Sequence, residues 1–322
     1  MTLLITGAAG FTGRTLVQHL VSKGEADIYG IVHRMQSDLN KNMKCVEGDL
    51  LDQRQIQDII AKICPDRIIH LAGIQKGNLQ DLLRTNVIGT QNLLDAAHSV
   101  NPSCRIVIAS SSAVYGYAGT APIPETIPAA PRSLYGISKA AQEMVAILDH
   151  VAHGSLITIV RPFNLVGPGQ PATFVCGRII NQIEKIQSGL QTMLNLVEVE
   201  SRRDFIDVRD VCRAYALLVN HPHFGTQCSG QIFNVGSEKA YSISEVIRII
   251  EKITGTSYSI NLSDGYQNLL IPTQKSDNTR IKAISDWHPE ISLETTLTDM
   301  LAENHINWDR EDLNIAVKPP ST

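Results

Sequence analysis

The stretch Gly7-Ala-Ala-Gly-Phe-Thr-Gly13 lies between a short apolar run, Thr2–Thr6, and an amphipathic segment, Thr12–Lys23. The apolar run predicts a buried strand and the amphipathic segment a helix, so the glycines form the turn between them. Glycines at such a turn let backbone N–H groups approach a pyrophosphate, which the positive end of the helix dipole attracts. The alternative is a turn that only packs the helix on the strand. We expect a dinucleotide to bind at Gly7, Gly10, Phe11, Thr12 and Gly13.

The first half of the chain repeats this alternation of apolar runs and amphipathic segments. Further strands are expected at Ile28–Val32, Lys44–Glu47, Arg67–Leu71, Arg105–Ser110 and Leu156–Arg161, and helices at Gln53–Ile63, Leu79–Val100 and Leu134–Val151. Parallel strands need crossover connections, which helices supply. Runs such as Ile106-Val-Ile-Ala are apolar without alternation, which indicates strands covered on both faces. The pattern predicts an α/β fold with a Rossmann-type doubly wound parallel sheet.

The second half of the chain does not continue the regular alternation of apolar runs and amphipathic segments. A segment rich in Pro and Gly, 162–171, breaks the pattern after Arg161 and predicts a loop. Helices are expected beyond it at Phe174–Gln187, Val208–Asn220, Ile243–Thr254 and Leu293–Glu303. We therefore expect residues 1–165 to form the dinucleotide-binding domain, to which some later segments return. Residues 166–322 are expected to form mainly a smaller substrate-binding lobe.

Composition narrows the class of protein. The 322 residues are 43% hydrophobic and 19% charged, and the formal net charge is −4. A general nucleic-acid or membrane-surface binder would show a basic excess, so neither partner is expected. No apolar stretch is long enough to span a bilayer, and no signal peptide is evident at the start. The cysteines are scattered without zinc-binding spacing, so we expect no metal and a cytoplasmic protein with reduced thiols at Cys45, Cys64, Cys104, Cys176, Cys212 and Cys228.

The ends of the second and third strands bear on the choice of cofactor. An acidic residue after the second strand would bind the ribose hydroxyls of NAD, but the sequence there is Val32-His33-Arg34. Arg34 could hold the 2′-phosphate of NADP, unless it is simply a solvated arginine. NADP(H) is therefore favoured, while NAD(H) stays possible. Asp49, with Leu50 beside it, follows the third strand and could meet the adenine, or it could be a turn residue that caps the next helix.

A second group of residues indicates proton-transfer chemistry. Ser111 lies in a serine run, 110–112, at the end of the fifth strand, where ligands of open α/β sheets bind. Tyr135 and Lys139 are four residues apart and share one helix face. A nearby ammonium should lower the pKa of the phenol, which could then exchange a proton while a nicotinamide exchanges hydride. An exposed tyrosine–lysine pair is the alternative, but the combination with the glycine turn favours catalysis.

These residues belong to a larger set of motifs that together resemble those of a known family. The chain resembles the extended short-chain dehydrogenase/reductase family, in its nucleotide-sugar epimerase/dehydratase branch. The matching stretches are Gly7–Gly13, Gly48–Leu50, His70–Ala72, Asn86–Thr90, Ser110–Gly116, Tyr135–Lys139, Arg161–Asn164, Gly167-Pro168 and Arg203–Val208.

The resemblance assigns roles to individual residues. It implies that Ser111, Tyr135 and Lys139 are catalytic and that Ser112, Asn164 and Arg203 bind substrate, with Arg203 at the diphosphate. It also implies that the cofactor contacts Tyr135, Lys139, His33, Arg34, Asp49, Leu50, Leu71, Ala72, Gly73 and Asn86. Members of the family pair their subunits through a four-helix bundle, here expected to use Leu79–Val100 and Leu134–Val151, so a homodimer is expected.

Within the family, residues 161–170, 174–175 and 203–210 are most similar to reductases that act on GDP-4-keto-6-deoxy-D-mannose. The likeness implies NADP(H)-dependent reduction of the 4-keto group of a nucleotide-activated 6-deoxy-hexose. A 4,6-dehydratase needs an acid beside the catalytic hydroxyl, and Ala113-Val114 supplies none, although the similar reductases are acidic there. They also have Arg-Pro where this chain has Gln267-Asn268. The alternatives are a nucleotide-sugar 4-epimerase with tightly bound NAD, and a non-catalytic NADP-binding regulator.

Overall fold

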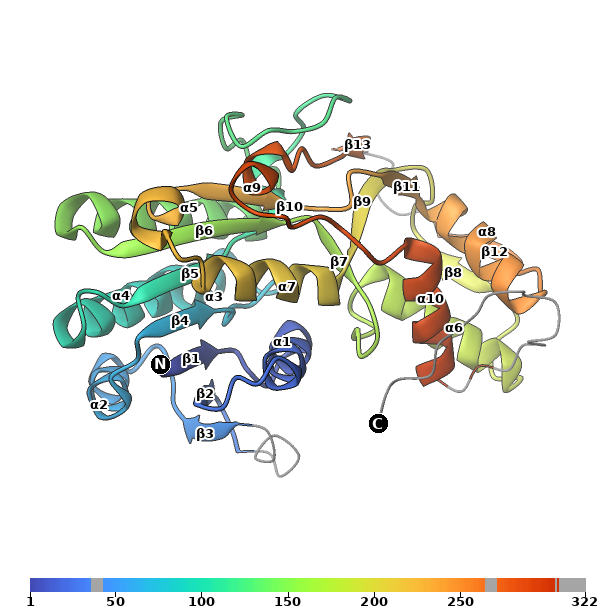
Figure 1. The fold of residues 1–322 in the computed structure, drawn as a ribbon. Helices are drawn as coiled ribbons and strands as arrows, with labels where there is room; N and C mark the ends of the chain where they lie inside the picture. The colour runs from blue at the N-terminus through green and yellow to red at the C-terminus, as the bar shows by residue number, and fades with distance from the viewer. Residues whose placement is uncertain (36–42, 264–270, 305, 307–322) are drawn as a thin grey trace.

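The structure, a computed structural model, describes residues 1–35, 43–263, 271–304 and 306. Its central feature is a sheet of seven strands in the order β10-β6-β5-β4-β1-β2-β3, in which every neighbouring pair is parallel (Figure 1). The strands are β1 (Leu3–Thr6), β2 (Ile28–Val32), β3 (Lys44–Glu47), β4 (Arg67–His70), β5 (Arg105–Ala109), β6 (Leu156–Pro162) and β10 (Ile232–Val235). The predicted Rossmann-type sheet is confirmed.

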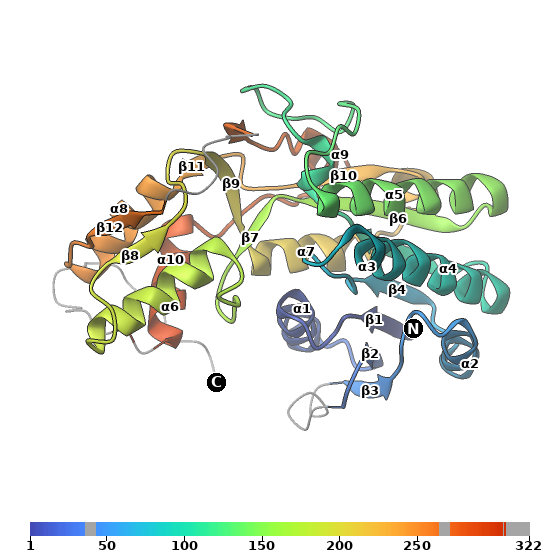
Figure 2. The same ribbon diagram turned by 180° about the vertical axis from the view of Figure 1, so that it is seen from behind.

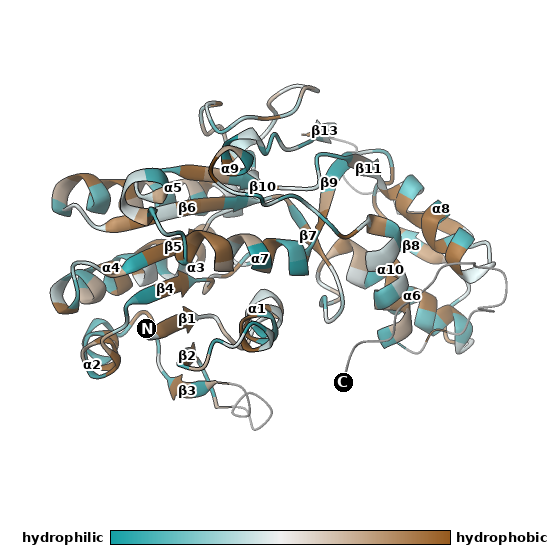
Figure 3. Cartoon of the chain, in the orientation of Figure 1, coloured by the Kyte–Doolittle hydropathy of each residue, from teal (hydrophilic) through white to brown (hydrophobic). Residues whose placement is uncertain are grey.

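Helices cover both faces of this sheet (Figures 1 and 2). One face carries α2 (Gln53–Ile63), α3 (Leu79–Leu83), α4 (Gly89–Val100) and α5 (Leu134–His153), and the other carries α1 (Phe11–Ser22), α7 (Val208–Val219) and α9 (Thr279–Ile284). Successive side chains of β1 point to opposite faces, so Leu3 and Ile5 pack toward α1 and α7 whereas Leu4 packs toward α2 and α4. Because both faces are covered, Leu3, Leu4 and Ile5 are all apolar, and Thr6 at the end of the strand is polar but buried (Figure 3).

The helix predicted over Leu79–Val100 is present but is not regular. A π-helical turn, Arg84–Ile88, joins α3 to α4. Such a turn accommodates an extra residue and is typical of functional sites. Here it carries the fully buried Asn86, whose side-chain amide donates to the carbonyl of Ile74 at 2.9 Å and accepts from its N–H at 2.8 Å. The irregularity therefore anchors the segment that follows β4.

A second lobe is built mainly from later segments. Its larger sheet pairs β9 (Arg202–Asp207) with β7 (Asn164–Val166), β11 (Ala240–Ser242) and β13 (Thr273–Gln274), and β8 (Leu194–Leu196) pairs with β12 (Ile260–Leu262). Helices α6 (Val175–Gln187), α8 (Ile243–Thr254) and α10 (Leu293–Glu303) pack around a separate apolar core. Between these elements the chain returns to the first sheet, where it adds α7, β10 and α9 (Figure 1).

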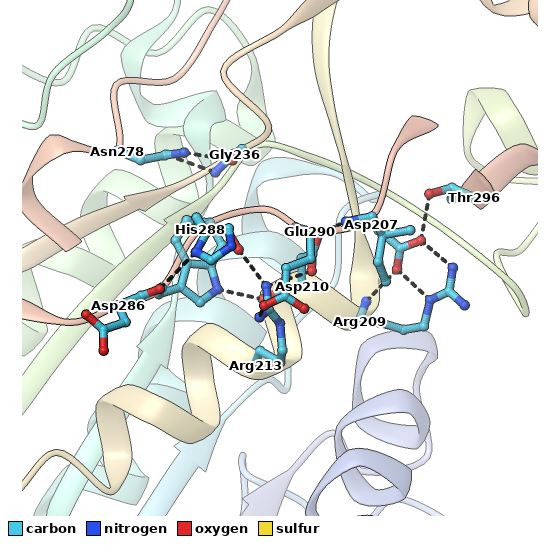
Figure 4. Close-up of polar contacts among 12 residues, drawn as sticks. Asp207, Arg209, Asp210, Arg213, Gly236, Asn278, Asp286, His288, Glu290 and Thr296 are labelled. Carbon is cyan, nitrogen blue, oxygen red and sulfur yellow. Dashed lines mark hydrogen bonds and ion pairs between the residues drawn. The ribbon is translucent and has the colours of Figure 1, made fainter. Parts of the chain in front are cut away.

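Two buried carboxylates connect the lobes at the start of α7 (Figure 4). Asp207 accepts from the side chain of Arg209 at 2.7 Å and from the hydroxyl of Thr296, on α10, at 2.6 Å. Asp210 accepts from the backbone N–H groups of Glu290 and Ile291, each at 3.0 Å. Buried charges with several hydrogen bonds define a geometry closely. These contacts place the second lobe beside the carboxyl ends of β5 and β6.

Candidate active site

A cavity of about 480 Å³ lies between the sheet and the second lobe. It is at the carboxyl edge of the parallel strands, where open α/β sheets bind their ligands. Its walls include residues predicted to bind the cofactor and residues predicted to act in catalysis or to bind substrate. Predicted residues lining it are Thr12, Leu71, Gly73, Ser111, Ser112, Tyr135, Lys139, Asn164 and Arg203.

The three glycines of the first turn differ in what a side chain at each position would meet. Gly7 has φ +70°, and a Cβ there would lie 2.7 Å from the N atom of Ala72. A Cβ on Gly13 would lie 2.3 Å from the carbonyl oxygen of Gly7. Gly10, in contrast, is exposed, and a Cβ would meet only that same oxygen, at 3.3 Å. No side chain caps the start of α1 at Gly10, so its first-turn N–H groups face open space that a phosphate could fill.

Replacing Gly10 with valine should abolish tight dinucleotide binding and leave the fold intact. The φ of −75° at this position suits any residue, but the side chain would fill the space above the turn. We expect the dissociation constant for NADPH, measured by fluorescence titration, to rise on the order of 100-fold. Gly13→Ala is the contrasting variant, because its collision with Gly7 should lower the melting temperature. Unchanged NADPH affinity in Gly10→Val would show that the turn does not hold the phosphates.

The predicted residues after β2 and β3 lie on the same side of the sheet. His33 and Arg34 are exposed directly after β2. The carboxylate of Asp49 accepts from the N–H of Leu51 at 2.9 Å, so it is a turn residue. The alternative that Asp49 caps the next helix is wrong, because Asp52 caps α2 by accepting from Gln55. Leu50 is buried in the apolar core beneath the turn.

Ser111, Tyr135 and Lys139 converge on the cavity from two elements. Ser111 caps the short 3-10 turn Ser112–Tyr115 by accepting from the N–H of Ala113 at 3.1 Å. Tyr135 is near the start of α5, and Lys139 follows one turn later on the same face. The side chains of Ser111 and Gln75 lie close enough to the phenol of Tyr135 to lower its pKa. The structure therefore brings the three residues together, as the sequence predicts.

One expectation about this group is wrong. Burial raises the pKa of Tyr135, and hydrogen bonds from Ser111 and Gln75 oppose that rise. Lys139 does not produce the expected lowering because its ammonium is directed elsewhere: Nζ donates to the carbonyl of Ala109 at 2.6 Å and to Oε1 of Gln142 at 2.7 Å. Burial lowers the pKa of Lys139 itself to about 8, against the opposing charge of Glu143.

The segment after β4 forms the wall between the glycine turn and α5. The N–H of Ala72 donates to the hydroxyl of Thr6 at 3.2 Å, and Leu71 and Gly73 line the cavity. Asn86 lies behind this wall and donates to Ile74 and to the hydroxyl of Ser138, at 2.9 Å each. The amide of Asn86 is thus occupied in holding the wall.

The second lobe contributes the polar groups of the opposite wall. Asn164, on β7, donates to the carbonyl of Asp204 at 3.2 Å. Arg203, on β9, donates to the carbonyl of Arg202 at 2.9 Å, and burial lowers the pKa of its guanidinium, with the charge of Glu198 opposing. Among the described residues Arg203 has no carboxylate in an ion pair. It is a partly desolvated cation facing the cavity, which favours an anionic ligand.

Sequence reasoning missed two glutamines of the site. Gln75 contacts the phenol of Tyr135 from the loop after β4, and Gln274 contacts Ser112 from the two-residue strand β13. Nε2 of Gln274 donates to the carbonyl of Ser112 at 2.9 Å. Neither glutamine carries a motif or a periodic position, so no signal in a single sequence could have identified them. The departure noted at Gln267-Asn268 lies outside the described residues.

The charge of the cavity is one-sided. Over the described part of the chain, its lining includes Lys139 and Arg203 but no aspartate or glutamate. The same residues contain no cluster of three or more side chains able to hold a metal ion. Nor does any described helix have the length and apolar character needed to cross a bilayer.

Comparison with known proteins agrees with this geometry. The family model described as GDP-mannose 4,6 dehydratase matches residues 4–300. The chain belongs to this family. The relatives of this chain have several activities, including a reductase, decarboxylases and 4-epimerases, so membership of the family alone does not define the reaction. The resemblance to extended short-chain dehydrogenases/reductases is confirmed.

Individual relatives align over nearly the whole chain. The GDP-6-deoxy-D-mannose reductase of Pseudomonas aeruginosa is 30% identical over 312 residues, covering 94% of this chain and 96% of that protein. A UDP-glucose 4-epimerase of Lacticaseibacillus casei is 27% identical, covering 96% of each chain. Among solved structures, RMD from Pseudomonas aeruginosa complexed with NADPH has a TM-score of 0.81 at 27% identity, covering 94% of this chain and 99% of that one.

Proposed function

We propose that this protein uses NADPH to reduce a keto group on the sugar of a nucleotide-activated 6-deoxy-hexose, at C4 of a substrate like GDP-4-keto-6-deoxy-mannose. The observation that carries the proposal is the cavity itself. It combines the neighbouring hydroxyls of Ser111 and Tyr135, the ammonium of Lys139 and the guanidinium of Arg203, without a carboxylate among its described lining residues. Likeness to the GDP-6-deoxy-D-mannose reductase of Pseudomonas aeruginosa, and to RMD from the same organism, whose structure is complexed with NADPH, supports the same assignment.

The residues present fit a dinucleotide cofactor. The uncapped start of α1 and the open space above Gly10 suit a pyrophosphate, and the exposed Arg34 directly after β2 is a cation that could bind a 2′-phosphate. Asp49, His33, Leu71, Ala72 and Gly73 lie along the same edge. Asn86 and Leu50 act through the backbone they hold, since both side chains are buried. The bound cofactor supplies hydride at its nicotinamide ring.

The chain's own residues supply the proton and the positioning. Tyr135 donates the proton from its hydroxyl to the keto oxygen, so that one hydride and one proton convert C=O to CH–OH and NADPH to NADP⁺. Ser111, whose hydroxyl lies beside the phenol, holds the same oxygen. The raised pKa keeps the phenol protonated at neutral pH, as a proton donor requires. Asn164 and Ser112 contact the sugar, and Arg203 pairs with the diphosphate.

The absence of an acid beside the catalytic hydroxyls argues against dehydration. Elimination of water across C5–C6 needs a base for the C5 proton and an acid for the leaving hydroxide. Ser112 is followed by Ala113 in the cavity wall, and no described lining residue is a carboxylate. Reduction needs only one proton donor, which Tyr135 provides.

The direct test is turnover. Purified protein incubated with NADPH and GDP-4-keto-6-deoxy-D-mannose should consume the absorbance of the reduced nicotinamide and form the 4-hydroxy sugar. A dTDP-linked 4-keto sugar serves as the comparison for the nucleotide. If neither substrate is reduced under conditions in which a known reductase turns over, the proposal fails.

Arg34 tests the choice of NADP over NAD. Arg34→Ala should weaken NADPH binding by about 10- to 100-fold, since it removes a charged partner of the phosphate, and change NADH binding little. Arg248→Ala, an exposed arginine on α8 in the second lobe, is the matched control. Both dissociation constants can be measured by fluorescence titration. An equal effect on NADPH and NADH would contradict the role.

An epimerase is the second candidate, because UDP-glucose 4-epimerases align over nearly the whole chain. An epimerase takes hydride from the sugar and returns it, so it keeps its cofactor and shows no net redox change. Mass spectrometry of nucleotides released from the purified protein separates the two. Copurified NAD at one equivalent would favour the epimerase, whereas exchangeable NADPH favours the reductase.

We also propose a homodimer, formed by α5 and the α3–α4 segment of two copies, in the cytosol. Large apolar side chains are exposed along α5, including Met144 at 66%, Leu148 at 66% and Val151 at 74%, and Ile88 beside it is 51% exposed. These helices lie together on one face of the molecule (Figure 2). An exposed apolar stripe of this kind indicates a protein interface.

Charged substitutions in this stripe should dissociate the dimer. Met144→Glu combined with Leu148→Glu should change the mass in light scattering from two subunits to one, because burying two carboxylates is strongly unfavourable. Leu190→Glu is the control, since Leu190 is 80% exposed in the second lobe. A wild-type protein that is monomeric at micromolar concentration would overturn the assignment.

A further inference from the structure

A chain of buried hydrogen bonds runs from the glycine turn to Lys139. The hydroxyl of Thr6, at the end of β1, lies 2.6 Å from Nδ1 of His70, and Nε2 of His70 lies 2.8 Å from the hydroxyl of Thr90. Gln142 then joins Thr90 to Lys139, with Nε2 at 2.8 Å from Thr90 and Oε1 at 2.7 Å from Nζ. Thr6, His70, Thr90 and Gln142 are all fully buried.

The donors and acceptors of this chain can be ordered in only one way. The hydroxyl of Thr90 donates its single proton to the carbonyl of Asn86 at 2.7 Å, so it can only accept from its other two neighbours. Nε2 of His70 and Nε2 of Gln142 must therefore both carry the donated protons. Burial lowers the pKa of His70 to about 3, which keeps the ring neutral with its proton on Nε2. The amide of Gln142 is thus held with its oxygen toward Lys139.

This arrangement leaves Lys139 with neutral acceptors only. The nearest carboxylate is Glu143, one turn further along α5, but its two oxygens accept from Arg161 at 2.8 and 2.6 Å and from Ser110. Two of the three Nζ protons go to Gln142 and to the carbonyl of Ala109. Lys139 lines the cavity, and Nζ lies beside Gly73, where a Cβ would be 3.7 Å from it.

We propose that Gln142 is a positioning residue for Lys139: its oriented amide oxygen holds the ammonium in place and retains its charge without an ion pair. This inference rests on the proposed function, because it concerns the cation that assists Tyr135. A buried ammonium is stabilised by each acceptor it keeps, and a neutral acceptor does so without tying the cation to a carboxylate. The other groups facing Lys139 are Tyr135, the neutral His70, and Glu143 with its partner Arg161.

The test measures the titration of Lys139 directly. In protein labelled with ¹³C,¹⁵N-lysine, the Lys139 signals are assigned by their loss in Lys139→Met and followed by NMR against pH. Gln142→Met keeps the shape of the side chain but removes the acceptor, so the pKa of Lys139 should fall by about one unit. Gln142→Glu keeps an acceptor and adds a negative charge, so the pKa should rise by at least as much.

The opposite directions of the two expected pKa shifts distinguish a positioning role of Gln142 from a packing role. If Gln142 only filled space, both substitutions would shift the pKa of Lys139 in the same direction. The matched control is Gln182, a buried glutamine on α6 that donates to the carbonyl of Asn195 at 3.3 Å in the second lobe. Gln182→Met should leave the Lys139 titration unchanged. Equal titration of Lys139 in wild type, Gln142→Met and Gln142→Glu would overturn the inference.

The two proposals can fail independently. The NMR titration needs no substrate, so opposite shifts without turnover on any keto sugar would sustain the role of Gln142 and reject the reductase. Turnover with an unshifted Lys139 would do the reverse. Where turnover is found, the alkaline limb of kcat/KM should move in the direction of the measured Lys139 shift in each variant.

Discussion

Tyr135→Phe should lower kcat for the proposed reduction by about 10²- to 10⁴-fold, the usual range for loss of a positioned proton donor. The ring is retained, so the shape of the cavity and the dissociation constant for NADPH should change little. Stopped-flow measurement of NADPH oxidation gives kcat, and fluorescence titration gives the affinity. Tyr117→Phe, a nearby tyrosine that is 46% exposed and does not line the cavity, is the matched control.

The pH dependence of the wild type adds a second check on this group. Proton donation needs the neutral phenol, and burial raises the pKa of Tyr135, so the phenol stays protonated through neutral pH. Lys139, with its pKa lowered to about 8, is charged below that pH and neutral above it. We expect the charged form of Lys139 to be the active one, because a positive charge beside Tyr135 favours the negative charge that develops on the substrate oxygen as hydride is transferred. Activity should therefore be full below the Lys139 pKa and decline as pH rises through about 8. A Tyr135→Phe enzyme with undiminished kcat would remove the phenol from the mechanism.

The sheet could be predicted closely because its signal is local. The central residues of β4 and β5, Ile68-Ile69 and Ile106–Ile108, are apolar on both faces because helices cover the sheet on each side. The π-helical turn around Asn86 could not be predicted in this way. It is accompanied by hydrogen bonds between Asn86 and Ile74, twelve residues earlier, and hydrophobic periodicity does not report such contacts.

The candidate site also has features that could be predicted from the sequence and features that could not. Tyr135 and Lys139 were predictable because their spacing places them on one helix face, and Ser111 because it ends a strand. Their electrostatics were not, since the direction of the Lys139 ammonium depends on Gln142 and Ala109 rather than on its distance from Tyr135. The return of β10 to the first sheet likewise depends on pairing with β6 across more than seventy residues of sequence.

The second large effect is expected from substitution of Arg203, which should weaken binding of the nucleotide sugar. It is the only described cation on the second-lobe wall of the cavity, and its hydrogen bond there is to a backbone carbonyl. A bound diphosphate would give this guanidinium the anionic partner it lacks in the protein. Arg203→Met keeps the aliphatic stem and removes the charge, so KM for the nucleotide sugar should rise by about 10- to 100-fold. The effect on kcat should be smaller, because the diphosphate is remote from the reacting carbon.

The neighbouring residue, Arg202, provides a matched control for this prediction. Arg202 precedes Arg203 on β9 but points the other way, where it pairs with Glu245 at 2.9 Å and donates to the carbonyl of Ala240 at 2.7 Å. Arg202→Met removes the same charge from the same strand without entering the cavity. It should leave KM for the sugar nucleotide within about twofold of wild type, since a surface ion pair contributes little. If both variants raised KM equally, the effect would come from the strand or the general field of the lobe. If only Arg203→Met does so, the diphosphate is bound at Arg203, and the cavity has a fixed polarity with the nucleotide on the second lobe and the reacting carbon at Tyr135.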